Sequence, residues 1–213
     1  MTKFSKFIII FIVSIALIYM YSFNSYRIRK FDDFLTYDEC DYIIEKANKK
    51  EFQNSKVTSM KDGIKVDVPS PSRTSTNLFL HTENDELLKR IDRQVEEICG
   101  KPIENYEALQ VVKYTGGQFY NEHFDATHHD KRGGLRFCTV LIYLNDDFEE
   151  GTTYFPLLKE HCVPKKGSAV LFYDVCMWPF NDCIHPMSKH AGIPPKNGTK
   201  YICNKWVRCK KYI

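Results

Sequence analysis

The stretch Tyr114–Asp125, YTGGQFYNEHFD, ends in a histidine and an aspartate separated by one residue, His123 and Asp125. The residues before them favour a strand, in which alternate side chains share a face, so these two side chains should project together. Far downstream, residues 190–206 read HAGIPPKNGTKYICNKW and supply His190 and, ten residues later, a lysine. Two imidazoles and one carboxylate on one face of a metal leave positions open for a co-substrate and O2, as in non-haem iron(II) oxygenases. The two stretches therefore predict a metal-dependent oxygenase.

A second His-x-Asp pair, His128 and Asp130, is an alternative to the first. It lies in the run ATHHDKRGG, whose residues are typical of a loop. We therefore expect this pair to be solvated, with contact to a substrate as its second reading.

Short strand-like runs follow one another from Glu107 onward. They are rich in β-branched and aromatic residues and are separated by Gly, Pro and Asp turns, a pattern that predicts a β-sandwich or a jelly roll. The six runs are residues 107–114, 118–124, 136–144, 152–156, 168–173 and 200–207.

Two helices are predicted before these strands. Thr36–Glu39 is a capping box, which predicts a helix to about Lys50. A second helix should begin near Thr82 and end at Gly100. Both should pack against the outside of a sheet. The apolar residues at helical spacing are Cys40, Ile43, Ile44 and Ala47 in the first helix, and Leu87, Leu88, Ile91, Val95 and Ile98 in the second.

The segment between the helices, residues 57–80, is polar and contains two prolines and a glycine. It is predicted to be a loop, either a plain surface loop or a lid that grips a peptide, because loops on a rigid scaffold often carry binding residues.

The N-terminal residues 7–23 are apolar apart from two serines and are flanked by Lys and Arg on both sides. As a helix this run would be about 25 Å long, slightly less than the ~30 Å hydrocarbon core of a membrane. No good cleavage site follows it, so residues 1–26 are predicted to be an uncleaved signal anchor rather than a signal peptide. Residues 27–213 then form one domain.

Five motifs in this order resemble those of the prolyl 4-hydroxylases in the 2-oxoglutarate/Fe(II) dioxygenase family. The resemblance extends from about Phe31 to Arg208. It implies an α+β, mainly β fold, a double-stranded β-helix (jelly roll) with supporting helices, in which His190 and Lys200 face His123. The motifs are VVKYTGGQFYNEHFD (111–125), GGLRFCTVLIYLND (133–146), EEGTTYFP (149–156), PKKGSAVLFY (164–173) and HAGIPPKNGTKYICNKWVR (190–208).

The same resemblance implies roles for individual residues. His123, Asp125 and His190 would bind iron, and Lys200 would pair with the distal carboxylate of 2-oxoglutarate by a charge-assisted bond. Tyr114 and Tyr143 match positions that hold the co-substrate, and Trp206 matches one that lines the pocket. Arg73, Ser75, Glu107, Arg136 and Arg208 match positions implicated in substrate engagement.

Two features depart from the family pattern. An acidic position of the family's Gly-Gly-Glu-Thr turn is lost, because the turn reads Gly151-Thr152-Thr153 here. The loop before His190 contains a further histidine, His185, which is an alternative third ligand. The ten-residue step from His190 to the lysine favours His190 and leaves His185 on the pocket rim.

The resemblance implies 4-hydroxylation of prolyl residues in proline-rich or collagen-like peptides, with 2-oxoglutarate converted to succinate and with Fe(II), O2 and ascorbate required. One alternative is an oxygenase that acts on another side chain, such as lysine. Another is a membrane-tethered peptide-binding module without catalysis, which would not need the triad or the lysine. The net charge of +3 gives no sign of nucleic-acid binding.

The eight cysteines include no Cys-x-x-Cys pair, so a structural zinc site is not indicated. The N-terminal signal predicts location at the endoplasmic reticulum membrane, with the catalytic domain in the lumen, where disulfides form. Cys176 and Cys183 are the predicted pair, whereas Cys138 and Cys203 should be buried small hydrophobes. The sequon Asn197-Gly198-Thr199 is expected to stay unused, because a glycan beside Lys200 would crowd the pocket.

Overall fold

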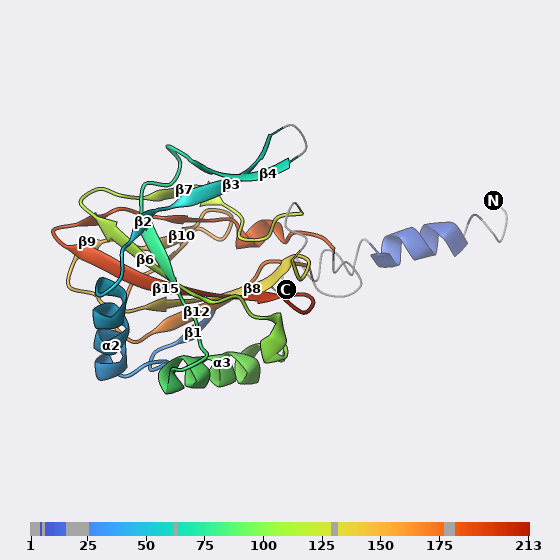
Figure 1. Ribbon diagram of the computed structural model, residues 1–213. Helices are drawn as coiled ribbons and strands as arrows, with labels where there is room; N and C mark the ends of the chain where they lie inside the picture. The colour runs from blue at the N-terminus through green and yellow to red at the C-terminus, as the bar shows by residue number, and fades with distance from the viewer. Residues whose placement is uncertain (1–4, 6, 16–25, 62–63, 129–131, 177–181) are drawn as a thin grey trace.

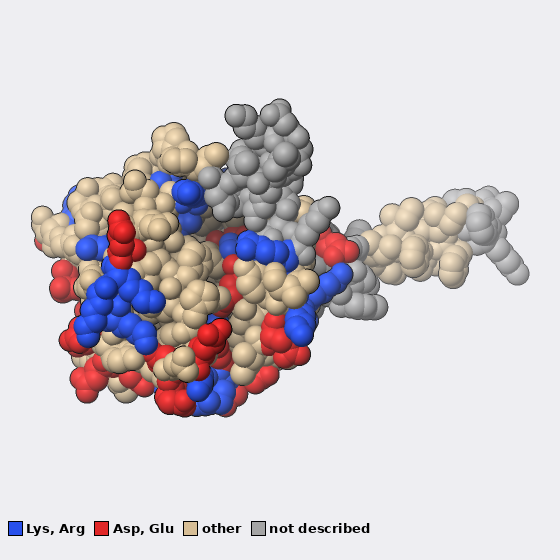
Figure 2. Space-filling model, in the orientation of Figure 1, with Lys and Arg blue, Asp and Glu red and all other residues tan. Residues whose placement is uncertain are grey.

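The computed structural model describes residues 5, 7–15, 26–61, 64–128, 132–176 and 182–213. Two stacked antiparallel sheets form its body, and two helices cover the outer face of the larger sheet (Figure 1). This is the predicted jelly roll, mainly β with supporting helices. Figure 2 shows basic and acidic side chains mixed over one face of the molecule.

The larger sheet has seven strands in the described part of the chain, in the order β1-β12-β8-β15-β6-β5-β2. Its strands are β1 (Arg29–Phe31), β12 (Ala169–Tyr173), β8 (Arg136–Tyr143), β15 (Thr199–Arg208), β6 (Leu109–Thr115), β5 (Thr76–Leu80) and β2 (Gln53–Asn54). The smaller sheet has the order β11-β10-β13-β7. Its strands are β11 (Glu160–Cys162), β10 (Thr153–Phe155), β13 (His190–Gly192) and β7 (Tyr120–His123).

Two further strand pairs and two short 3-10 helices lie outside these two sheets. The pairs are β14 (Pro195–Lys196) with β9 (Glu149–Glu150), and β3 (Lys56–Lys61) with β4 (Ile64–Pro69). The 3-10 helices are η1 (Ile103–Asn105) and η2 (Pro186–Ser188).

The two-residue period of the long strands separates two cores. On β15, Ile202 belongs to the core between the sheets, together with Val112 of β6. The next residue, Cys203, belongs to the core between the larger sheet and the helices, together with Val111. Lys200 shares the face of Ile202, so the alternation directs a charged side chain into the space between the sheets.

The helices are α2 (Tyr37–Asn48) and α3 (Glu86–Cys99). The predicted capping box is confirmed: Thr36 Oγ1 accepts from Glu39 N, and the Glu39 carboxylate accepts from Thr36 N. Helix α3 begins four residues later than predicted, because Asp85 is its N-cap and accepts from Leu88 N at 3.0 Å. It ends at Gly100 as predicted, with a left-handed φ of 69°.

Each of the six predicted strands overlaps an observed one, namely β6, β7, β8, β10, β12 and β15. The prediction of a loop over residues 57–80 was wrong. This segment contains most of the β3–β4 hairpin and the whole of β5, which is held by its pairing with β6. Pro69 is the last residue of β4, and Pro71 lies in the turn that follows, positions that a two-stranded hairpin tolerates.

Residues 7–15 are helical, and their large apolar side chains are exposed, from 37% for Ile15 to 70% for Phe7. Residues 16–25 of the predicted anchor lie outside the described residues. No helix in the described part of the chain is long and apolar enough to cross a membrane.

All eight cysteines have free thiols, so the predicted Cys176–Cys183 disulfide is wrong. The two residues are nevertheless neighbours: Cys176 N donates to Cys183 O at 2.8 Å, and their two thiols are within hydrogen-bond distance of each other. The prediction for Cys138 and Cys203 is confirmed, since both are fully buried.

Candidate metal centre and co-substrate site

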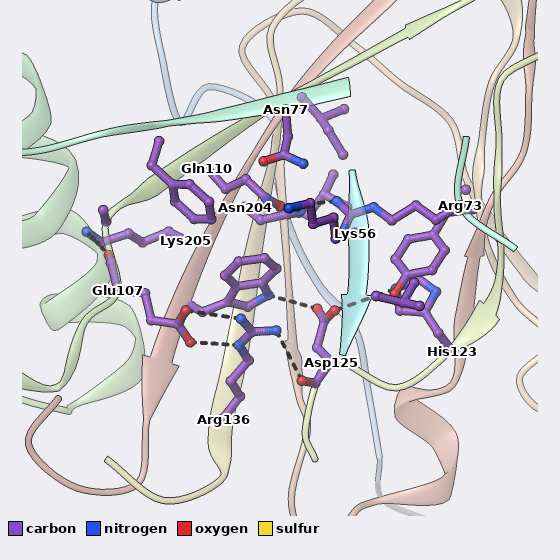
Figure 3. A pocket seen from close by; sticks show the side chains of 18 of the residues that line it. Lys56, Arg73, Asn77, Glu107, Gln110, His123, Asp125, Arg136, Asn204 and Lys205 are labelled. Atoms are coloured by element: carbon purple, nitrogen blue, oxygen red, sulfur yellow. Dashed lines mark hydrogen bonds and ion pairs between the residues drawn. The ribbon is translucent and has the colours of Figure 1, made fainter. Parts of the chain in front are cut away.

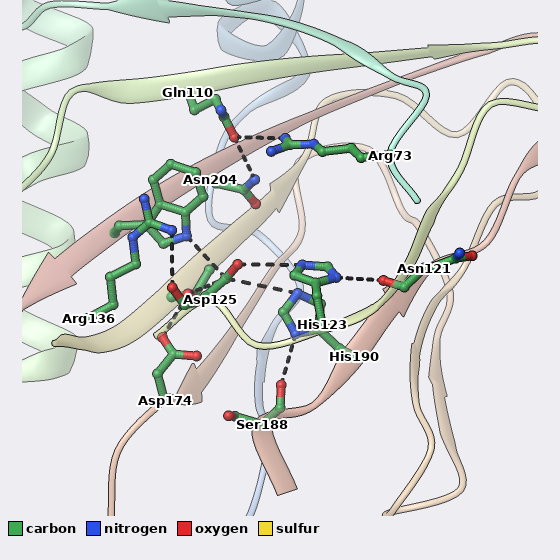
Figure 4. Close-up of polar contacts among 12 residues, drawn as sticks. Arg73, Gln110, Asn121, His123, Asp125, Arg136, Asp174, Ser188, His190 and Asn204 are labelled. Carbon is green, nitrogen blue, oxygen red and sulfur yellow. Dashed lines mark hydrogen bonds and ion pairs between the residues drawn. The ribbon is translucent and has the colours of Figure 1, made fainter. Parts of the chain in front are cut away.

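The smaller sheet assembles the predicted ligand group. His190 at the start of β13 is the register partner of His123 at the end of β7, and Asp125 follows two residues later (Figure 4). The Asp125 Oδ1 atom lies 3.5 Å from His123 Nε2, and Oδ2 lies 3.9 Å from His190 Nε2. One potential ligand atom from each of the three residues lies within 4.8 Å of the other two.

Both imidazoles are oriented by main-chain carbonyls. His123 Nδ1 lies 2.8 Å from Asn121 O, and His190 Nδ1 lies 2.8 Å from Ser188 O. An Nδ1–H that donates to a carbonyl leaves the Nε2 lone pair free for a metal. Burial and the neighbouring His123 lower the pKa of His190 to about 4, so its ring is neutral at pH 7, as metal binding requires.

Asp125 is buried and held by two donors. Its Oδ2 accepts from Thr139 Oγ1 at 2.7 Å and from Trp206 Nε1 at 3.1 Å. Burial opposes ionisation, but the interactions with His190, His123 and Arg136 hold the pKa of Asp125 well below its ordinary value. The carboxylate is therefore charged and fixed in direction.

A second buried carboxyl group, Asp174, directly follows β12 and was not predicted from the sequence. Its Oδ2 lies 2.9 Å from Thr139 Oγ1, and its Oδ1 has no hydrogen-bond partner among the described residues. Burial and the charge of Asp125 raise the pKa of Asp174 well above its ordinary value, which favours the uncharged form of this carboxyl group. The one signal in the sequence was an acidic residue at the end of a fully apolar strand.

These three ligands fit iron(II). Two neutral imidazoles and one carboxylate on one side of a pocket form a facial triad that leaves coordination positions open. The triad lines a pocket of about 1220 Å³ that also reaches β5, β6 and β15 (Figure 3).

The predicted co-substrate lysine, Lys200, lies deep in the same pocket. It pairs with Tyr114 across β15 and β6, is 1% exposed, and has no carboxylate within ion-pair distance among the described residues. Its Nζ donates to Gly151 O at 2.6 Å and lies over the Tyr114 and Tyr143 rings at 5.2 and 5.9 Å. Burial lowers its pKa to about 7. A carboxylate of a bound acid would supply the missing counter-charge.

The turn that departs from the family pattern supplies the carbonyl for Lys200. Gly151 has a left-handed φ of 63°, and a Cβ there would lie 2.6 Å from the Phe148 ring, so this position requires glycine. Tyr143 lies behind this region and does not line the pocket; its hydroxyl donates to Thr153 Oγ1 at 2.9 Å. Tyr114 does line the pocket.

The residues predicted to engage a substrate fall into two groups. Arg73, Glu107 and Arg136 line the pocket, whereas Ser75 and Arg208 do not. The Ser75 hydroxyl is buried and donates to another serine. Arg208 is 1% exposed and donates to Glu107 Oε1 at 2.6 Å from outside the pocket.

Glu107 also forms a two-point ion pair with Arg136, at 2.7 and 3.0 Å. The Arg136 guanidinium lies over the Trp206 ring at 3.4 Å and donates to Asp125 O at 3.2 Å. Trp206 lines the pocket as predicted. Glu107, Arg136 and Trp206 thus connect the pocket wall to the iron ligand Asp125.

The alternative ligands lie elsewhere. His185 is 3% exposed, and its ring packs against Tyr26 at 4.3 Å, so it is a buried residue and not part of the pocket rim. The choice of His190 over His185 agrees with the ligand group. His128 is exposed as expected, and Asp130 lies outside the described residues.

A jelly roll with an open His-Asp-His triad and a buried lysine defines a non-haem iron oxygenase that uses an acidic co-substrate. A model of the 2OG-Fe(II) oxygenase superfamily matches residues 109–208. Prolyl 4-hydroxylase 1 of Arabidopsis thaliana is 37% identical, over 86% of this chain and 69% of that protein. The chain belongs to the prolyl 4-hydroxylase family and is a 2-oxoglutarate- and Fe(II)-dependent dioxygenase.

Solved structures agree in fold. The viral collagen prolyl hydroxylase of Paramecium bursaria Chlorella virus-1, solved as a 2OG complex, is 28% identical with a TM-score of 0.69, covering 87% of this chain and 97% of that one. A prolyl hydroxylase of Trichoplax adhaerens, solved with a peptide fragment of hypoxia inducible factor, has a TM-score of 0.64 at 17% identity, covering 88% and 86%.

Proposed function

We propose that this protein hydroxylates prolyl residues, at the 4-position, in proline-rich or collagen-like peptides. The observation that carries the proposal is that one pocket holds a facial triad and a buried lysine without an ion-pair partner among the described residues. A module that only binds peptides has no need of either feature. Membership of the prolyl 4-hydroxylase family supports proline as the target.

His123, Asp125 and His190 would hold Fe(II), and Lys200 would pair with the distal carboxylate of 2-oxoglutarate. When bound, Fe(II) with 2-oxoglutarate and O2 supplies the oxidation, in which 2-oxoglutarate becomes succinate and CO2 and one oxygen atom enters the substrate. Ascorbate would keep the iron reduced. The protein's part is to orient these groups and to exclude water.

The chain's own residues define where a peptide docks. Arg136 and Trp206 stack beside Asp125, and Tyr120 stacks on His123 with ring centroids 3.4 Å apart. Proline-rich peptides adopt an extended polyproline II helix, which docks on aromatic side chains at low entropic cost. We infer that Tyr120 and Trp206 flank the ring of the target proline.

The test is product analysis by mass spectrometry with the full chain, Fe(II), 2-oxoglutarate and ascorbate. The panel contains proline-rich, collagen-like and lysine-containing peptides. We expect one added oxygen on proline and one succinate for each hydroxylation. Oxygen on lysine instead would favour the alternative oxygenase, and iron binding without any product would favour the peptide-binding module.

We also propose that residues 7–23 tether the catalytic domain, residues 27–213, to the endoplasmic reticulum membrane with the domain in the lumen. Support comes from the run of exposed apolar side chains on the helix at residues 7–15. The full chain should float with liposomes in a density gradient, and the double variant Ile10→Glu/Phe11→Glu should float less. Equal flotation would contradict the tether.

A further inference from the structure

The pocket continues past the metal centre over a polar floor. In the register of the larger sheet, Asn204 of β15 pairs with Gln110 of β6, and Gln110 pairs with Phe79 of β5. Asn77 lies two residues before Phe79, so its side chain shares the same face. Asn77, Gln110 and Asn204 all line the pocket, and we call these three carboxamides the amide shelf (Figure 3).

Arg73, which has no ion-pair partner in the part of the chain that the structure describes, lies between the amide shelf and the triad. Arg73 is 9% exposed, and its Nε has no hydrogen-bond partner among the described residues. Its Nη2 makes one long contact, 3.4 Å to Gln110 Oε1, an atom that already accepts from Asn204 Nδ2 at 3.2 Å. A buried guanidinium with unused donors is costly unless a ligand supplies acceptors.

A second cation, the exposed Lys56, lines the same part of the pocket (Figure 3). The acidic side chains of the pocket wall do not neutralise these two cations. Each of these acidic side chains already has an ion-pair partner or belongs to the triad, except Glu83. Glu83 is exposed on the connection from β5 to α3. The ion pairs are Asp92 with Lys205, Glu107 with Arg136, and Glu122 with Lys189, and Asp125 belongs to the triad.

The chemistry of an extended peptide matches this surface. A polyproline II segment has no internal hydrogen bonds, so its carbonyls can accept from carboxamide and guanidinium donors. The Arg73 guanidinium lies 4.6 Å from the Tyr120 ring, which is stacked on His123 at 3.4 Å. Arg73 is therefore within about one polyproline turn, roughly 9 Å or three residues, of the triad.

We propose that Arg73, Lys56 and the amide shelf form a second subsite that binds the flank of an extended peptide. The amide shelf would bind peptide carbonyls, and the two cations would select an Asp or Glu about three residues from the target proline. The proposal rests on the proposed function and names a substrate class for it, proline-containing peptides with an acidic flank.

The first test compares peptides that differ at one position. Glu, Gln or Lys is placed in turn at each of the five positions on either side of one proline, and kcat/KM is measured from the oxygen gained. We expect the Glu peptide to exceed the Gln peptide by about tenfold near the third position, and the advantage to shrink as salt is raised. Equal values for Glu, Gln and Lys at every position would overturn the proposal.

A charge reversal tests the cation directly. Lys56→Glu should invert the order, so that the Lys peptide becomes better than the Glu peptide. The matched control is Lys50→Glu, an exposed lysine just after α2 and outside the pocket wall, which should keep the original order. An unchanged order in Lys56→Glu, or an equal inversion in Lys50→Glu, would contradict the subsite.

A binding measurement separates this proposal from the proposed function. Fluorescence anisotropy of labelled peptides on the iron-free chain needs no turnover. Tighter binding of the Glu peptide, with no oxygen gained by any peptide, would support the subsite and defeat the hydroxylase. Hydroxylation of all peptides, with no difference in binding or in kcat/KM, would support the hydroxylase and defeat the subsite.

Discussion

At the metal centre, hydrogen bonds from outside the triad orient each ligand. Main-chain carbonyls fix the two imidazoles, and Thr139 and Trp206 fix the carboxylate. Such partners set the direction of a ligand's lone pair and raise the affinity for the metal. The iron site is therefore a property of residues that carry no ligand atom as well as of those that do.

Thr139→Val tests one of these partners. The substitution keeps the shape of the side chain but removes the hydroxyl between Asp125 and Asp174, so we expect iron affinity to fall about 10- to 100-fold. Iron titration of the apo chain measures this, and Thr139→Ser should restore most of the affinity. Unchanged binding in Thr139→Val would show that Trp206 alone orients the carboxylate.

Lys200 predicts a pH dependence of co-substrate binding. Burial lowers its pKa to about 7 in the free site, and a bound carboxylate must raise it, so binding takes up a proton above pH 7. The Kd of 2-oxoglutarate should be flat below pH 7 and should rise above it, by at most about tenfold per pH unit. Calorimetric titration under anaerobic conditions from pH 6 to 9 measures this.

The same residue affects stability without ligand. Its pKa in the folded chain, about 7, is lower than the ordinary 10.5, so the unfolded chain binds more protons between these values. The free energy of unfolding should therefore gain a contribution that rises with pH from about 7 to 10.5. Lys200→Met should remove the pH dependence of both co-substrate binding and stability. A 2-oxoglutarate Kd that does not change with pH in the wild type would contradict the role assigned to Lys200.

At the scale of elements, strand pairing brings distant residues together. His123 and His190 are 67 positions apart by their numbers, yet they are register partners on β7 and β13. Lys200 is fixed by pairing of β15 with β6 and faces inward because of the two-residue period. Helix α3 adds Lys89 and Asp92 to the pocket wall, and both helices bury the outer face of the larger sheet.

Asp85 links the two helices and gives a stability prediction. It caps α3, forms an ion pair with Lys46 of α2, and accepts from Tyr42 at 2.9 Å. Asp85→Ala should lower the free energy of unfolding by about 1–3 kcal/mol, because the helix cap is lost together with the ion pair to the partly exposed Lys46.

Chemical denaturation measures this change, and Glu97→Ala on the exposed face of α3 is the matched control, with an effect of about 0.5 kcal/mol or less. Equal effects of the two substitutions would show that the cap is unimportant. Turnover well below the melting temperature should be the same in both variants.

The sequence predicted the elements whose signal is local. The capping box at Thr36, the glycine that ends α3 and the six strand runs could all be read from residue spacing. The start of α3 was predicted too early because both Thr82 and Asp85 are residues that commonly cap helices. Asp85 is the cap, and the Thr82 hydroxyl donates to Asp92 instead. Strand β5 was missed because its pairing with β6 is a long-range contact.

The same distinction applies to the site. The triad and Lys200 were predicted because motif spacing carries them. Asp174 and the amide shelf were not, because only the register and the packing of separate strands bring Asp174 to Thr139 and the three carboxamides into the pocket. Ser75 and Arg208 match family positions but do not line the pocket, because the sequence position of a residue does not show which groups its side chain contacts.

At the scale of the whole molecule, the candidate site lies between two sheets, and no disulfide links these sheets in the described part of the chain. The core between the two sheets holds the aromatic residues that surround the triad. The core between the larger sheet and the helices holds most of the aliphatic residues. Four of the eight cysteines are fully buried or nearly so in these cores, three of them in strands and Cys40 in helix α2, which suits small apolar groups.

The thiol count tests this arrangement. The full chain, unfolded without reductant, should react with a thiol reagent at all eight cysteines. Alkylation and peptide mapping then check each position. A count of six, with Cys176 and Cys183 unreactive, would restore the disulfide that the structure lacks.

The most direct test of the central claim is the iron content of the full chain after anaerobic reconstitution and gel filtration. The account predicts one iron per chain for the wild type and for His128→Ala, which alters an exposed histidine outside the triad. It predicts near-complete loss in His190→Ala and in Asp125→Ala, with circular dichroism spectra unchanged. Full iron content in His190→Ala would contradict the triad and, with it, the proposed chemistry.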